Sequence, residues 1–244
     1  MGWSMQKLGE FDSPYGTITI LCNTGTGTVI YEQAGAYQSE SDSQGVSLVA
    51  YIHALYGLIC ESGAKSVLII GCAGGTLGTM MTRNGCSVTV VDVNPTSFPI
   101  AKAFFNLPES VRCEVADGRD FLLSDTHTYD AIVLDAYQGT RIPSHLQSQS
   151  FFRLARSKLT TKGALFVNVH IEHDGDVVAD RIVDCMANIW PEARLLDTHG
   201  LRDRNAIAMA GAVAGLSRPY LRMSPTCDAN VIDAELAMMT YRDC

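Results

Sequence analysis

Long apolar runs, paired cysteines and an excess of basic residues are all missing from this sequence. No stretch reaches the roughly 18 consecutive apolar residues that a membrane-spanning helix needs, so the sequence predicts no such helix. The eight cysteines include no Cys-x-x-Cys pair, and several stand inside apolar runs, which indicates buried thiols in a reducing compartment rather than a disulfide framework. Glu10 and Asp12 come early, and no apolar segment of a signal peptide accompanies them, so we expect a cytoplasmic protein.

The charge balance excludes two kinds of partner. The chain carries 26 acidic and 18 basic residues, which gives a formal net charge of −8. Phosphate backbones and anionic membranes bind basic surfaces, so we expect neither a nucleic acid nor a membrane as a partner. The expected partner is a small molecule that is neutral or cationic, with a homodimer as the candidate assembly.

The sequence does contain a regular alternation of β-type and helix-type segments. Short apolar runs predict parallel strands at 66–70, 87–91, 111–115, 131–134 and 164–169, and helical patterns stand between them. Such an alternation predicts a doubly wound α/β sheet. Two more strands, 193–196 and 205–210, follow each other without a helix and are expected to pair antiparallel at the sheet edge. The expected sheet therefore has seven strands, with a terminal antiparallel strand.

The two ends of the chain differ from this pattern. Two β-rich runs within residues 15–33 flank a glycine-rich turn and predict a β-hairpin. The last segment is irregular, apart from an expected helix near 231–239. We therefore expect an N-terminal β-hairpin unit (1–45), a Rossmann-like catalytic domain (46–216) and a C-terminal tail (217–244).

Glycines and acidic residues follow the expected strands at the edge where α/β proteins bind ligands. The first strand ends in a loop from Gly71 to Gly78, and Asp92 ends the second strand about 20 residues later, which suits a ribose diol. Asp117 follows the third strand and Asp135 the fourth. The glycine spacing is not Gly-x-Gly-x-x-Gly and no Gly-Lys-Ser/Thr follows, so the set predicts a nucleoside site that is neither a typical nicotinamide site nor a P-loop.

The order of these motifs resembles the spermidine synthase (polyamine aminopropyltransferase) family, within the class I methyltransferase fold that binds S-adenosylmethionine (SAM). The resemblance covers about residues 10–212. It rests on the glycine loop, Val-Asp-Val-Asn-Pro at 91–95, Asp-Gly-Arg-Asp-Phe-Leu at 117–122, Tyr-Asp-Ala-Ile-Val-Leu-Asp-Ala-Tyr at 129–137, Ile-Pro-Ser-His-Leu at 142–146 and Phe-Phe-Arg-Leu at 151–154.

This resemblance implies roles for individual residues. Asp92 would bind the ribose, Asp117 would face the adenine, and Asp135 would handle the attacking amine. The residues expected to contact the nucleoside are Gln38, Gly71, Ala73, Gly74, Gly75, Asp92, Val93, Asp117, Gly118 and Asp135. The expected catalytic residues are Asp135 and Tyr137, and those expected to contact the acceptor are Tyr51, Gln138 and His145.

Two departures from the family pattern bear on the reaction. Gly74 stands where the family has the acid that holds the amine of decarboxylated SAM, and Gln138 stands where it has a second acid after Asp135. With glycine at 74, loop N–H groups would be free to receive the carboxylate of SAM. We therefore expect SAM as donor and methyl transfer to a small acceptor. The alternatives are aminopropyl transfer from decarboxylated SAM, or aminocarboxypropyl transfer, to an amine, and a non-catalytic nucleoside-binding protein.

Four further side chains allow two interpretations each. His170 and His173 have no third partner at a fixed spacing, so a polar loop is favoured and no metal is expected. His145 is either a general base or an anchor for its loop. Tyr137 either lines the acceptor pocket or is a packing aromatic.

Overall fold

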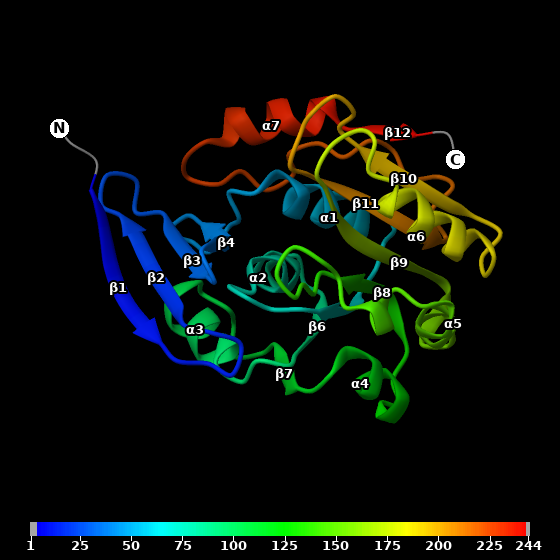
Figure 1. Cartoon of the computed structure of the whole chain (residues 1–244), viewed down its shortest axis with the longest axis horizontal. Coiled ribbons are helices and arrows are strands. Elements are labelled where there is room, and N and C mark those ends of the chain that lie inside the picture. The colour runs from blue at the N-terminus through cyan, green and yellow to red at the C-terminus, as the bar shows by residue number, and fades with distance from the viewer. Residues whose placement is uncertain (1–3, 243–244) are drawn as a thin grey trace.

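The computed structural model describes residues 4–242, and its N-terminal part is a four-stranded antiparallel sheet at one side of the molecule (Figure 1). Its strands, in spatial order, are β1 (Met5–Phe11), β2 (Ile18–Asn23), β3 (Val29–Gln33) and β4 (Ala36–Ser41). The predicted hairpin is β2 and β3. Sequence analysis missed β1 and β4, because most side chains of β1 are exposed and the only buried residue of β4 is the polar Ser41, so neither strand carries apolar alternation.

The main sheet has eight strands rather than the seven that the sequence predicts. The order across the sheet is β12-β10-β11-β9-β8-β5-β6-β7. The strands are β5 (Ser66–Ile70), β6 (Ser87–Asp92), β7 (Arg112–Val115), β8 (Tyr129–Leu134), β9 (Leu159–Ile171), β10 (Ala193–Asp197), β11 (Arg204–Gly211) and β12 (Thr240–Arg242). Strands β5 to β9 are parallel, and β11 lies antiparallel between β9 and β10. The additional strand, β12, comes from the C-terminal tail and pairs antiparallel with β10.

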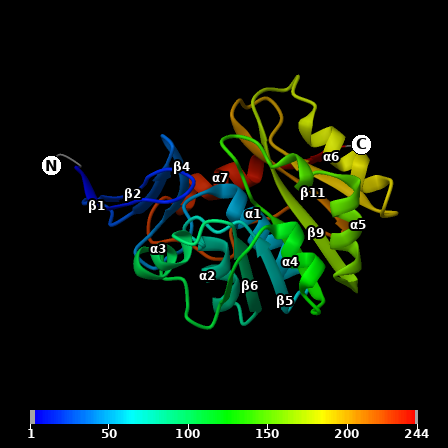
Figure 2. The same ribbon diagram turned by 60° about the horizontal axis from the view of Figure 1, so that its bottom comes forward.

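Helices cover both faces of this sheet. They are α1 (Ala50–Glu61), α2 (Thr76–Arg83), α3 (Ser97–Phe104), α4 (Gly118–Ser124), α5 (Gln149–Ser157), α6 (Val178–Ala187) and α7 (Ala229–Met238), with a 3₁₀ turn at Ser144–Leu146. One core contains apolar side chains of α1, α2, α3 and α7, and the other contains those of α4, α5 and α6. The helix expected near 231–239 is α7, which packs along α1 (Figure 2). Within residues 4–242, no helix is both long and apolar enough to cross a membrane.

The C-terminal tail contacts both the N-terminal unit and the main domain. The N–H of Thr226 in the tail donates to Oδ2 of Asp42, which directly follows β4 (2.8 Å). Ile232 and Leu236 of α7 are buried in the same core as α1. The division at residues 45 and 216 stays a prediction.

The register of the parallel strands brings three chain segments to one edge. Ile70 at the end of β5 pairs with Val91 of β6 on one side and with Leu134 of β8 on the other. The residues that follow are therefore neighbours in space. This places the glycine loop between Asp92 and Asp135, as the sequence predicts for a ligand site at this edge.

Candidate active site

Asp135 is held between two neutral hydrogen-bond donors. The hydroxyl of Tyr51 in α1 donates to its Oδ2 (3.2 Å), and the side-chain amide of Asn168 in β9 donates to its Oδ1 (2.7 Å). Burial raises the pKa of Asp135 above its ordinary value, and the two hydrogen bonds only partly oppose this. Within residues 4–242, Asp135 forms no ion pair. Such a carboxylate is suited to bind an amine and to accept its proton.

Sequence analysis missed the two asparagines behind Asp135. The side-chain amide of Asn205 in β11 donates to Oδ1 of Asn168 (2.9 Å), which orients the Asn168 amide group toward Asp135. Asn168 is only 2% exposed, inside the apolar run of β9. A buried polar side chain needs a partner. The position of Asn168 inside an apolar strand therefore indicated a buried side chain with a polar partner, but the sequence did not show that this partner is Asp135.

Tyr137 connects the end of β8 to β9. Its hydroxyl donates to the carbonyl of Asn168 (2.8 Å) and accepts from the N–H of His170 (2.9 Å). Its ring is half-buried and lines the cavity described next. The structure therefore shows both a structural anchor and a wall residue, and a catalytic role of Tyr137 stays a prediction.

A cavity lies between the glycine loop, α1 and β4. Its wall includes Gln38, Tyr51, Gly71, Ala73, Gly75, Asp135 and Tyr137, together with Ser39, Ser47, Cys72 and Thr76. Gly71 has a positive φ of 105°, and a side chain there would collide with the carbonyl of Asp135. Only glycine permits this close approach of the two strand ends. The structure thus brings together on one wall several residues that the sequence assigns to nucleoside and acceptor.

Three of the loop N–H groups that we expected to be free, those of Cys72, Gly74 and Gly75, have partners in the structure. The N–H of Cys72 donates to Asp92 (2.7 Å), that of Gly74 to Oγ of Ser39 (3.0 Å), and that of Gly75 to the carbonyl of Cys72 (2.7 Å). A Cβ atom on residue 74 would lie 2.8 Å from Cβ of Ser39 and 2.9 Å from Cδ1 of Phe105. Position 74 therefore has no room for an acidic side chain, but it also offers no free N–H group to a carboxylate.

Asp92 lies beside the glycine loop, outside the wall of the cavity. Its Oδ2 accepts from Cys72 and its Oδ1 accepts from the N–H of Asn94, each at 2.7 Å. Burial raises the pKa of Asp92 above its ordinary value, against the effect of these backbone hydrogen bonds. The neighbouring Val93 is 42% exposed and is available at the surface. Ribose binding by Asp92 and contact through Val93 stay predictions.

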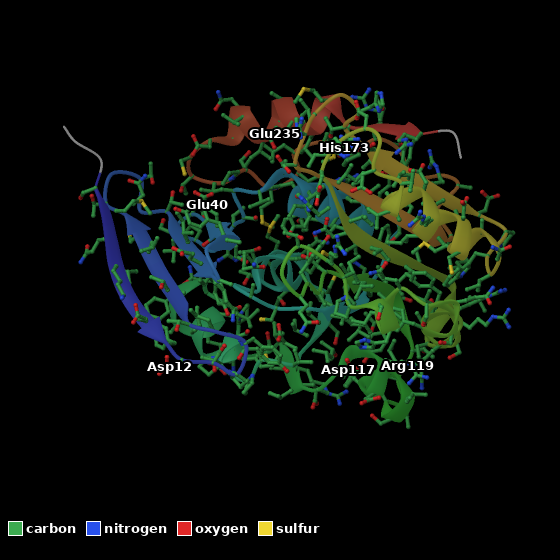
Figure 3. The ribbon with its side chains drawn as sticks, in the orientation of Figure 1. Asp12, Glu40, Asp117, Arg119, His173 and Glu235 are labelled. Atoms are coloured by element: carbon green, nitrogen blue, oxygen red, sulfur yellow. The ribbon has the colours of Figure 1, made fainter. Side chains whose placement is uncertain are left out.

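Asp117 caps the N-terminus of α4 and is joined by His145. Its Oδ1 accepts from the N–H groups of Arg119 and Asp120 (2.8 and 3.2 Å), and Nε2 of His145 lies 2.8 Å from its Oδ2. Asp117 and Arg119 are neighbours at the start of α4 (Figure 3). Burial raises the pKa of Asp117, but His145 and the backbone donors bring it below its ordinary value. A side chain on Gly118 would collide with Ile70, which explains the glycine. His145 thus contacts Asp117 instead of Asp135, as a loop anchor would.

The remaining polar side chains lie away from Asp135. Gln138 is exposed and pairs through its backbone with Arg141. Nε2 of His170 lies 4.0 Å from Asp203, and Nδ1 of His173 accepts from the N–H of Gly175. His173 lies in the loop after β9 (Figure 3). In the described part of the chain, no three His, Cys, Asp or Glu side chains gather as metal ligands.

Comparison with curated proteins gives mostly polyamine aminopropyltransferases and, over shorter stretches of the chain, two methyltransferases, and no family model matches the chain. The chain is 27% identical over 156 residues to a probable polyamine aminopropyl transferase of Bifidobacterium longum, covering 63% of this chain and 35% of the relative. It is 28% identical over 170 residues to the polyamine aminopropyltransferase of Chromobacterium violaceum, covering 67% and 63%. The match covers 35% of the length of the first relative and 63% of the length of the second, so the chain spans less than two thirds of either.

Solved structures show the same fold. A probable spermidine synthase from Corynebacterium glutamicum superposes with a TM-score of 0.78 at 18% identity, covering 96% of this chain and 90% of the other. Human methyltransferase-like protein 13, solved with SAH, gives a TM-score of 0.54 at 18% identity, covering 77% and 89%. The expected class I methyltransferase-like fold and the resemblance to spermidine synthases are confirmed. The relatives' names favour aminopropyl transfer, which sequence analysis ranked second.

Proposed function

We propose that this chain transfers the aminopropyl arm of decarboxylated SAM to a small amine. The observation that carries this proposal is the Asp135 carboxylate on the wall of the glycine-loop cavity, held by two neutral donors. The relatives' names support the aminopropyl arm. This reverses the order of our sequence-based hypotheses, because the N–H groups of Cys72, Gly74 and Gly75, which we expected to be free for the carboxylate of SAM, have partners.

The chain's own residues would perform three tasks. Asp92, Val93 and the glycine loop would position the nucleoside, with Asp117 and Gly118 on its adenine side and Gln38 above it. Asp135 would orient the amine nitrogen toward the donor carbon and take the proton that the nitrogen loses. Tyr51 and Asn168 would fix the carboxylate, so little reorganisation accompanies the transfer. The sulfonium of the donor supplies the activated carbon and a neutral thioether as leaving group.

Methyl transfer from SAM is the second candidate, and one observation favours it. Position 74 holds no acid and has no room for one, and Gln138 is neutral. The site therefore lacks the two carboxylates that the family resemblance assigns to the cationic ends of donor and acceptor. A donor or acceptor with fewer positive charges would lose less by their absence.

Identification of the by-product nucleoside tests both candidates. The purified chain is incubated with an amine and either SAM or decarboxylated SAM, and the products are analysed by mass spectrometry. We expect methylthioadenosine from decarboxylated SAM, and none with heat-inactivated protein. S-adenosylhomocysteine from SAM would establish methyl transfer instead. Failure of both donors with a broad set of amines, neutral, cationic and carboxylated, would contradict a transferase function.

A further inference from the structure

A second and larger cavity adjoins the site on the far side of Tyr137. Its volume is about 800 Å³, and Tyr137 lines both this cavity and the one at the glycine loop. Its walls are the loop from Gln138 to Gln147, the segment from His170 to Val178, and Arg181 of α6. An acceptor whose amine reaches Asp135 has this cavity as the space for the rest of its length.

Two arginines in this wall have no partner. Within residues 4–242, neither the guanidinium of Arg141 nor that of Arg181 forms a hydrogen bond, an ion pair or a ring contact. Both side chains belong to exposed residues and line the cavity from different elements, the loop after β8 and α6. An unpaired arginine offers a planar set of donors that matches a carboxylate.

Two acidic residues, Glu172 and Asp176, line the same wall and balance the formal charge of the arginines without pairing with them. Asp176 accepts from the N–H groups of Val178 (3.0 Å) and Glu172 (3.4 Å), so its carboxylate is engaged at the start of α6. Glu172 is exposed. Gln138 adds a neutral amide where the family resemblance calls for a second acid. The wall therefore combines two unpaired arginines with two acids, of which Asp176 already accepts two backbone N–H groups, and such a wall suits an acceptor of mixed charge better than a second ammonium group.

We infer that the acceptor is an amine that also carries a carboxylate, with its nitrogen at Asp135 and its carboxylate at Arg141 and Arg181. This inference rests on the proposed function and narrows its substrate class. In the reaction, the nitrogen forms a bond to the transferred carbon while the carbon–sulfur bond breaks. The electron pair of the broken carbon–sulfur bond goes to sulfur, and the proton that the nitrogen loses goes to Asp135. The carboxylate of the acceptor takes no part in this step and serves recognition only.

Three four-carbon amines form a matched set of probes: 4-aminobutanoate, 1,4-diaminobutane and butylamine. They share the reacting amine and differ at the other end, which is an anion, a cation or a methyl group. By-product nucleoside is measured with each, for the wild type, for the double variant Arg141→Gln, Arg181→Gln, and for Arg153→Gln. Arg153 is an exposed arginine of α5 that lines neither cavity.

We expect 4-aminobutanoate to be used at least tenfold better than 1,4-diaminobutane in kcat/KM. The double variant should lose roughly 10- to 150-fold with 4-aminobutanoate, the usual effect of a charge-assisted bond, and should keep its rate with butylamine. Arg153→Gln should match the wild type with all three amines. A preference for 1,4-diaminobutane, or equal losses with 4-aminobutanoate and butylamine, would overturn the inference while leaving the transfer reaction standing.

Binding separates this inference from the proposed function. Calorimetry with 4-aminobutanoate in the presence of methylthioadenosine requires no turnover. Weaker binding of 4-aminobutanoate to the double variant than to Arg153→Gln supports the carboxylate site. If no amine is converted at the same time, the proposed transfer function is contradicted while the carboxylate site is still supported. No binding of 4-aminobutanoate to the wild type at millimolar concentration contradicts the inference.

Discussion

At the residue scale, the chemistry depends on a carboxylate without a cationic partner. Asp135 is bound only by neutral groups, Tyr51 and Asn168, and burial raises its pKa above the ordinary value. A group whose pKa is raised in the folded state contributes stability at a pH below its unfolded pKa, and this contribution is lost as the pH rises through the folded value. At neutral pH the ionised Asp135 therefore lowers the free energy of unfolding, and the same ionised group is available as a base for the reaction.

Replacement of Asp135 by Asn should separate activity from stability. The amide can still accept from Asn168 and can donate to the Tyr51 oxygen, so the fold is kept. Turnover should fall about 10²- to 10⁴-fold, the usual contribution of a general base. The melting temperature at pH 8 should equal or exceed that of the wild type, because a buried charge is removed, and the difference should vanish near pH 3. Scanning calorimetry at both pH values and initial rates at pH 8 give these quantities.

Two results would contradict this role of Asp135. Full turnover per folded molecule would show that the carboxylate takes no part in transfer. A melting temperature several degrees lower at pH 8 would show that its charge stabilises the fold. Asp120→Asn is the matched control, because Asp120 is an exposed acid on α4 whose side chain has no hydrogen-bond partner among the described residues.

The sequence predicts some of these residues and not others, for a physical reason. Asp92, Asp117 and Asp135 could be placed near one another because parallel strands end at one edge of the sheet. The bonds of Asn168 to Asp135 and Asn205 join side chains of different strands. These hydrogen bonds depend on side-chain rotamers and on the register between β9 and β11, and the residue pattern of a single strand gives no information on either. The same holds for the pairing of His145 with Asp117.

At the element scale, the glycine loop is packed against the N-terminal sheet. Gly74 donates its N–H to Ser39 of β4 and lies against Phe105, which follows α3. β4 also provides Gln38, which lines the cavity. The N-terminal sheet is therefore part of the site, although the sequence revealed only its central hairpin. The inner parallel strands β5, β6 and β8 were predictable because they are mostly apolar and buried, whereas β12 has only three residues and little apolar pattern.

Substitution of Gly74 by Ala should destabilise the chain through overpacking. The added Cβ would lie 2.8 Å from Ser39 and 2.9 Å from Phe105, inside normal contact distance. Overpacking costs about 1–3 kcal/mol. For a chain of this length that corresponds to a melting temperature lower by roughly 2–12 °C. Gly215→Ala is the control, because nothing lies within 4 Å of a Cβ there. Equal melting temperatures of the two variants would show that the loop moves freely away from β4.

At the scale of the whole molecule, an ion cluster joins the end of the chain to the main sheet. Asp197 in β10 is fully buried and accepts from Nε and Nη2 of Arg204 in β11 (2.7 and 3.0 Å) and from Arg242 in β12 (3.3 Å). Arg242 also donates to Asp180 of α6 (2.9 Å). Burial raises the pKa of Asp197, but Arg204 and the other donors bring it below its ordinary value. The last strand is thereby connected to both the sheet and a helix.

Asp197→Asn should weaken the whole fold in a pH-dependent way. Removing one partner of a buried ion pair costs about 3–5 kcal/mol, because Arg204 stays buried without its main counter-charge. A lowered folded pKa means that this stability is present above the unfolded value, near 3.9, and is lost as the pH falls through the folded value. Urea unfolding at pH 7 should therefore show the full loss, and the gap between variant and wild type should narrow by pH 3. The control Asp184→Asn removes the same charge at an exposed position of α6 and should lower the free energy of unfolding by less than about 0.5 kcal/mol. A gap that stays constant from pH 7 to pH 3 would mean that Asp197 acts through packing and not through its charge.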